Sequence, residues 1–155
     1  MNCTILVVED EAPKRERLLQ FLKDQWVDAV VRTAKSVRSA ISDIQGATPQ
    51  LLLLDMSLPT FDIGPDEPGG RPQGFGGIEV MRYVDLFEIK LPIIVVTAYE
   101  AFSRDGGGAL NHDDLDQQLR VEHPENYRGL VYYNSLFSDW KTQLAKLIVE
   151  QLRCD

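Results

Sequence analysis

The sequence contains only two cysteines, no run of basic residues, and no apolar segment near the roughly 20 residues of a membrane span. Cys3 and Cys154 lie near opposite ends without metal-ligand spacing, so we expect reduced thiols rather than a metal site. The start, MNCTILVVEDE, lacks the basic region of a secretion signal. These absences predict a soluble, cytoplasmic protein.

The charge balance is acidic, with a formal net charge of −8 and a pI near 4.7. Such a surface repels nucleic acid and anionic membranes, so we expect neither as a partner. The composition is 44% hydrophobic and 26% charged, which is ordinary for a globular protein. The length of 155 residues predicts a single domain, 1–155.

Short apolar runs predict the strands. None of the three strongest runs alternates with polar residues, which is typical of strands covered on both faces in a parallel sheet. These strong runs are Thr4–Val8, Leu51–Leu54 and Ile93–Val96, and two weaker candidates are Asp28–Thr33 and Leu130–Tyr133.

Helical patterns lie between the predicted strands. The first covers Pro13–Gln25, and the second is capped by Ser36 and ends at Gly46. The third covers Gly77–Phe87, and the fourth is capped by Asn111 and ends before Pro124. The fifth is a C-terminal apolar stripe capped by Ser138. Alternating strands and helices predict an α/β fold, a doubly wound parallel sheet with helices on both faces.

Polar side chains follow three of the strands. Glu9 and Asp10 follow the first, Asp55 the third, and Thr97 the fourth. Ligands bind outside the carboxyl ends of such sheets, so these groups should share one crevice. Like charges about 4 Å apart repel by roughly 4 kcal/mol at an effective dielectric of 20, so the cluster needs a counter-charge. Carboxylate ligands favour Mg²⁺ or Mn²⁺, and a carboxylate can also act as a nucleophile toward phosphorus.

The segments ILVVEDE, LLLLDMSLP, GGIEVMRYV and PIIVVTA together resemble the receiver domain of two-component response regulators. The resemblance implies a flavodoxin-like fold with five strands in the order 2-1-3-4-5. It also implies that the protein is not an enzyme, that Asp55 accepts phosphate from a histidine kinase or phosphotransfer protein, and that the signal passes to a separate effector protein.

The resemblance assigns roles to the other site residues. Asp10 would bind Mg²⁺ directly and Glu9 through water, with Asp55 and the backbone carbonyl of Ser57 completing the protein ligands. The hydroxyl of Thr97 would turn toward the phosphoryl group and couple it to the outer face.

A lysine that the family places after the fifth strand is missing here. Counting back from the residues that follow the strand puts Ser135 at the lysine position, whereas counting forward from the start of the strand puts Tyr133 or Asn134 there. Lys141 lies too far along the last helix to substitute. The loss removes a charge-assisted contact to phosphate, so either phosphorylation is weaker or another cation reaches the site.

Two segments depart from a minimal fold. The loop at about 60–74 is an insertion, for which we hypothesise a lid or a partner contact, with Arg71 a candidate for the missing cation. The alternative is a surface insertion without a role. The region at about 99–128 is atypical because three glycines discourage its helix. The family also has an aromatic residue in the fifth strand that changes conformation together with the threonine, and among the candidate positions here only Tyr132 is aromatic.

Two functions remain open: a stand-alone phosphoacceptor receiver, and a pseudo-receiver that binds partners without phosphorylation. A Mg²⁺-dependent phosphatase is less favoured because no second acid lies two residues after Asp55. A flavodoxin is disfavoured because no phosphate loop follows the first strand.

Overall fold

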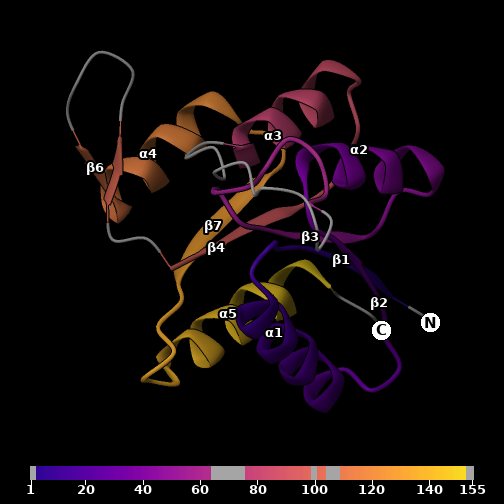
Figure 1. The fold of residues 1–155 in the computed structure, drawn as a ribbon, viewed down its shortest axis with the longest axis vertical. Helices are drawn as coiled ribbons and strands as arrows, with labels where there is room; N and C mark the ends of the chain where they lie inside the picture. The colour runs from indigo at the N-terminus through magenta and orange to yellow at the C-terminus, as the bar shows by residue number, and fades with distance from the viewer. Residues whose placement is uncertain (1–2, 64–75, 99–100, 104–108, 153–155) are drawn as a thin grey trace.

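The computed structural model describes residues 3–63, 76–98, 101–103 and 109–152. Its main sheet has five parallel strands in the order β2-β1-β3-β4-β7, which confirms the predicted flavodoxin-like topology (Figure 1). The strands are β1 (Thr4–Val8), β2 (Val30–Ala34), β3 (Leu51–Leu54), β4 (Ile93–Thr97) and β7 (Tyr127–Tyr132).

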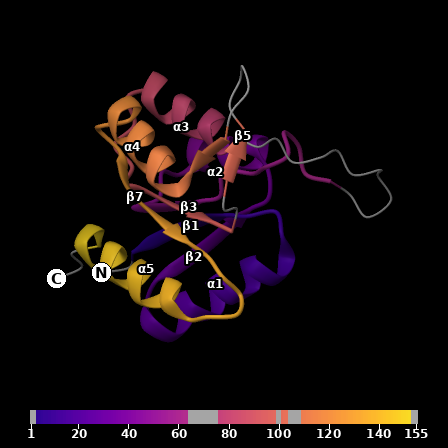
Figure 2. The ribbon, with the colours of Figure 1, turned by 90° about the vertical axis from the view of Figure 1, so that its left-hand side faces the viewer.

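Helices cover both faces of this sheet. They are α1 (Ala12–Gln25), α2 (Val37–Gly46), α3 (Gly76–Leu86), α4 (His112–Glu122) and α5 (Asp139–Gln151). Figures 1 and 2 show α1 and α5 on one face and α2, α3 and α4 on the other, and each face has its own hydrophobic core. No helix in the described part of the chain has the length and apolar character that a membrane crossing requires.

The four leucines of β3 are divided between the two cores. Leu51 and Leu53 pack in the core under α1 and α5, while Leu52 and Leu54 pack in the core under α2, α3 and α4. Side chains of a strand alternate between faces, so a central strand covered on both sides needs apolar residues throughout. The strand ends at Leu54, so Asp55 is the first residue beyond this buried run.

Two of the three predicted caps are confirmed. Ser36 accepts a hydrogen bond from the Ser39 N–H and forms a capping box at the start of α2. Asn111 Oδ1 accepts the Asp114 N–H at 2.8 Å at the start of α4. Ser138 occupies the N-cap position of α5, but its hydroxyl makes no capping hydrogen bond.

The region after β4 differs most from expectation. It contains a short antiparallel pair, β5 (Ala101–Ser103) and β6 (Ala109–Asn111), that the sequence pattern did not predict. Strand β7 begins three residues before the predicted Leu130, because it pairs with β4 from Ile93 onward across a bulge. Gly129 has φ 155° at this bulge, a value that favours glycine. Strand β2 begins at Val30, two residues later than predicted.

Cys3 forms a disulfide bond. The expectation of two reduced thiols is therefore wrong. The other cysteine of the chain, Cys154, lies outside the described residues.

Candidate functional site

The three predicted carboxylates converge at the carboxyl edge of the sheet. One oxygen each of Glu9, Asp10 and Asp55 lies within 4.8 Å of the others. Glu9 and Asp55 are 1% and 4% exposed, and Asp10 is half-buried. The parallel pairing of β1 with β3 brings the ends of these strands together, so the sequence prediction of a shared acidic crevice agrees with the geometry.

The backbone around Asp55 is held on two sides. Its N–H donates to the Val8 carbonyl at 3.1 Å, and the N–H of Gly77 donates to the Met56 carbonyl at 2.9 Å. A Cβ at Gly77 would lie 2.5 Å from the Asp55 carbonyl oxygen and 2.5 Å from Met56 Cε. Only glycine allows α3 to approach this closely, so the second glycine of GGIEV fixes the turn that carries Asp55.

A lysine that the sequence analysis did not select lies among the carboxylates. Lys14 Nζ lies 2.6 Å from Glu9 Oε2 and 3.4 Å from Asp55 Oδ1, and it donates a hydrogen bond of 2.7 Å to the Val96 carbonyl. The Lys14 side chain is 2% exposed. It supplies the counter-charge that the acidic cluster requires.

The position of Lys14 on α1 explains its burial. It precedes Leu18 by four residues and Leu22 by eight, and both leucines are buried against the sheet. Residues four apart share a helix face, so Lys14 continues the apolar stripe toward the site. A charged residue on that stripe, one turn after the acidic pair, was a signal in the sequence that we did not use.

Burial dominates the electrostatics of the crevice. It raises the pKa of Glu9 to about 8, against the lowering influence of Lys14 and with a further raising contribution from Asp55. It also raises the pKa of Asp55, again opposed by Lys14. Burial by itself lowers the pKa of Lys14, but Asp55 and Glu9 outweigh it and raise that pKa above its usual value. Lys14 therefore remains protonated at neutral pH.

Thr97 and Ser57 lie at the same edge of the sheet. Thr97 is the last residue of β4 and is fully buried, and its carbonyl accepts the Tyr133 N–H at 2.8 Å. Ser57 is 5% exposed, and its backbone hydrogen-bonds the Asp55 carboxylate. Tyr132, the predicted switch aromatic, is half-buried with its ring 4.5 Å from that of His112. The predicted roles of these residues remain predictions.

The first residues of the loop that is predicted to be an insertion contact the start of α2. Asp62 accepts a hydrogen bond of 2.6 Å from the Ser36 hydroxyl, and the Thr60 carbonyl accepts the Arg38 N–H at 3.0 Å. Arg71, the predicted substitute cation, lies outside the described residues.

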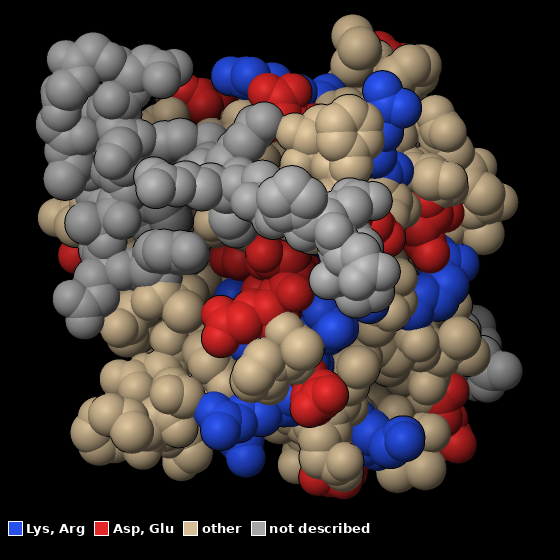
Figure 3. Space-filling view, viewed as in Figure 1, with Lys and Arg blue, Asp and Glu red and all other residues tan. Residues whose placement is uncertain are grey.

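The surface around the crevice is mixed in charge. On the face seen in Figure 3, acidic atoms gather near the centre with lysine and arginine side chains beside them. Arg15 lies at this edge and donates to the backbone carbonyls of Glu9 and Asp10 at 3.0 and 3.3 Å. Basic and acidic side chains are therefore interspersed on this face, and the whole chain carries a net charge of −8.

Residues 5–113 match the sequence profile of the response regulator receiver domain. The chain belongs to this family of two-component signalling proteins, whose receiver domains are non-enzymatic modules that bind Mg²⁺ and work with a kinase partner.

Two relatives match nearly the whole length of the chain. The chain is 28% identical to protein y4jR of Sinorhizobium fredii over 142 residues, which cover 90% of this chain and 92% of y4jR. It is 25% identical over 148 residues to the Detocs response regulatory protein DtcB of Enterobacter cloacae, covering 94% and 98% of the two chains.

Solved structures share the fold. The signal receiver domain of a putative LuxO repressor protein from Vibrio parahaemolyticus superposes with a TM-score of 0.64 at 22% identity, covering 97% of this chain and 93% of that one. Response regulator TrrA from Thermotoga maritima, solved in complex with Mg²⁺–BeF, gives a TM-score of 0.62 at 23% identity, covering 94% and 98%.

Proposed function

We propose that this protein is a phosphoacceptor receiver in a phosphorelay: Asp55 accepts a phosphoryl group with the help of Mg²⁺, and the protein signals by binding another protein. The observation that carries the proposal is the convergence of Glu9, Asp10 and Asp55 within 4.8 Å. A module that only binds partners has no need of three buried or half-buried acids at one sheet edge, because their mutual repulsion is costly.

The residues fit a magnesium ion. All the side-chain donors are carboxylate oxygens, the ligands that Mg²⁺ prefers. Glu9 Oε2 and Asp55 Oδ1 are buried, make no hydrogen bond of favourable geometry and pair with Lys14, so Mg²⁺ would have to share these oxygens with the ammonium group. We assign Asp10, Asp55 and the Ser57 carbonyl as direct ligands and Glu9 as a ligand through water. When bound, Mg²⁺ would neutralise charge on the phosphoryl oxygens and on the attacking carboxylate.

The chemical step is a phosphoryl transfer onto Asp55. A carboxylate oxygen attacks the phosphorus of a phosphohistidine, forming an O–P bond as the P–N bond breaks. The imidazole leaves with the electron pair and takes up a proton from solvent. The Thr97 hydroxyl at the end of β4 then approaches the phosphoryl group and shifts the conformational equilibrium toward the active state.

The proposed partners follow from this chemistry. A histidine kinase or phosphotransfer protein supplies the phosphoryl group, and a separate effector protein receives the signal from residues 1–155, acting as one domain in the cytoplasm. DtcB of similar length is named as a response regulatory protein, and the TrrA structure contains Mg²⁺–BeF, both of which support the proposal.

A pseudo-receiver is the second candidate. Lys14 pairs with both Glu9 and Asp55, and its single positive charge offsets part of their negative charge. A partly neutralised crevice of this kind can hold the fold together without phosphorylation, so this alternative requires a direct test.

The test is the intact mass of the protein after incubation with Mg²⁺ and acetyl phosphate. We expect the wild type to gain one phosphoryl group and Asp55→Asn to gain none, because an amide is not a nucleophile for this transfer. The exposed variant Asp28→Asn serves as a matched control and should react like the wild type. A wild-type protein that binds Mg²⁺ but gains no mass would favour the pseudo-receiver.

A further inference from the structure

We propose that Lys14, on the first helix, is the cation that contacts the phosphoryl group on Asp55, replacing the lysine that the family places after the last strand of the sheet. The inference rests on the proposed function, because it assigns a further catalytic residue to the same phosphoryl transfer.

The Lys14 ammonium lies across the ends of three neighbouring strands. Its partners are Glu9 after β1, Asp55 after β3 and the Val96 carbonyl in β4. A cation after the last strand would approach Asp55 from the sheet edge, whereas Lys14 approaches from α1. The target is the same carboxylate, and Nζ is already 3.4 Å from its Oδ1.

An aromatic residue at one of the candidate positions for the missing lysine packs beside Lys14. Thr97 pairs with Tyr132, so Tyr133 is the first residue beyond β7. Lys14 Nζ lies 5.8 Å from the centroid of the Tyr133 ring, which is backed by Trp140 at 5.0 Å between centroids. A tyrosine face at this distance attracts an ammonium group and limits its movement.

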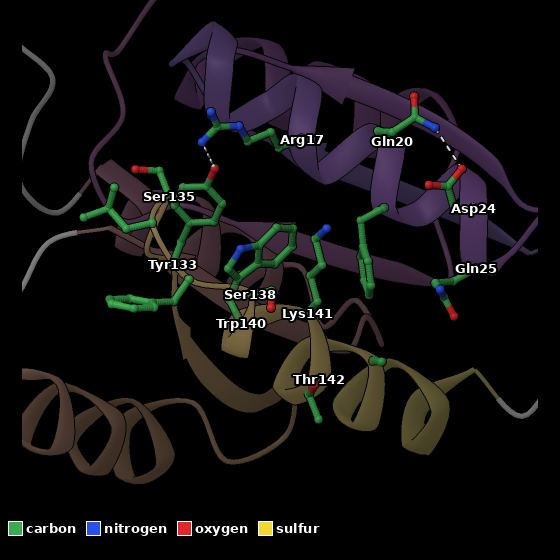
Figure 4. A pocket seen from close by; sticks show the side chains of 14 residues that line it. Arg17, Gln20, Asp24, Gln25, Tyr133, Ser135, Ser138, Trp140, Lys141 and Thr142 are labelled. Carbon is green, nitrogen blue, oxygen red and sulfur yellow. Dashed lines mark hydrogen bonds between the residues drawn. The ribbon is translucent and has the colours of Figure 1, made fainter.

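The neighbouring basic residues are engaged elsewhere. Lys141 Nζ lies 5.7 Å from the Trp140 ring, and the Arg17 guanidinium donates to the Tyr133 hydroxyl at 3.2 Å (Figure 4). Arg15 donates to backbone carbonyls. In the described part of the chain, the ion pair of Asp55 is made by Lys14.

Lys14 borders a cavity as well as the two carboxylates. A cavity of about 240 Å³ borders its side chain, and Ala98 and Tyr133 are among the residues that line it. A phosphoryl group on Asp55 would add negative oxygens close to Nζ, and charge-assisted hydrogen bonds to such oxygens are among the stronger ones. A metal ion, by contrast, would compete with Lys14 for Glu9 and Asp55, since both are cations that pair with the same oxygens.

The decisive variant is Lys14→Gln, compared with Lys23→Gln and Lys141→Gln, which remove the same charge from exposed positions. The rate of mass gain from acetyl phosphate with Mg²⁺ should fall by at least about 10-fold in Lys14→Gln, as expected when a charged group is removed from a transferring phosphoryl group. Calorimetry should show Mg²⁺ affinity equal to or above that of the wild type, because a competing cation is gone. Both exposed variants should match the wild type within about twofold.

A structure of the wild type with Mg²⁺ and beryllium trifluoride provides a measurement that does not depend on the variant folding. Lys14 Nζ should contact a fluorine on Asp55 at hydrogen-bond distance. Equal rates for wild type and Lys14→Gln, or an ammonium that stays on Glu9 away from the fluorines, would overturn the inference while leaving the proposed function intact. A wild type that gains no phosphoryl group would instead remove the proposed function itself, and with it the role of Lys14.

Discussion

Asp10→Asn should weaken Mg²⁺ binding by about 100-fold, since even residues behind the metal ligands cost up to this factor when replaced. Asp10 is the least buried of the three converging acids, so it can reach the ion without the full desolvation penalty of Glu9 and Asp55. An amide keeps the shape of the side chain but removes its charge. Titration calorimetry with Mg²⁺ measures the effect, and phosphorylation by acetyl phosphate should fall in parallel.

Glu11→Gln is the control for this prediction. Glu11 belongs to the same acidic run, but it is exposed and is not one of the three converging acids. Its Mg²⁺ affinity should stay close to that of the wild type. If both variants lose affinity equally, the effect comes from the general field of the acidic run, and the assignment of Asp10 as a direct ligand is wrong.

Gly77→Ala should lower the free energy of unfolding by about 3 kcal/mol, the upper part of the usual range for overpacking. The added methyl group would lie 2.5 Å from the Asp55 carbonyl oxygen and 2.9 Å from Met56 Cα, and backbone cannot move as readily as the end of a side chain. The clash pushes the turn that carries Asp55 away from α3. Urea denaturation measures the loss of stability, and a weaker Mg²⁺ affinity should accompany it.

Gly46→Ala is the matched substitution at the end of α2. A Cβ there meets nothing within 4 Å, so the variant should be unchanged or more stable by up to about 1 kcal/mol, because alanine favours a helix. Equal destabilisation in the two variants would show that loss of glycine itself, rather than the close approach of α3 to Asp55, is responsible.

Much of the fold could be predicted from the sequence. The runs at Thr4–Val8 and Leu51–Leu54 form strands with the predicted bounds, and Asn111 caps the predicted fourth helix. Such features depend on local patterns: a strand buried on both faces must be apolar throughout, and a helix start needs a polar acceptor. The convergence of Glu9, Asp10 and Asp55 also followed, because the carboxyl ends of parallel strands lie at one edge.

Several pairings between segments were less predictable. The β5–β6 pair joins two segments of three residues each, too short for a periodic signal. The disulfide of Cys3 and the early start of β7 also depend on which segments lie side by side in the folded chain. These contacts exist only once the sheet order has brought their partners together.

The residues of the sequence were enough to predict the acidic crevice, and its resemblance to the receiver family predicted the strand order and revealed the absence of a lysine after the last strand. Only the tertiary structure showed which cation lies beside Asp55. Lys14 has a long side chain that can turn to solvent or into the protein, and the packing of Leu18 and Leu22 on the sheet directs it toward Asp55. The direction of a flexible side chain is settled by the surfaces around it, which no single stretch of sequence contains.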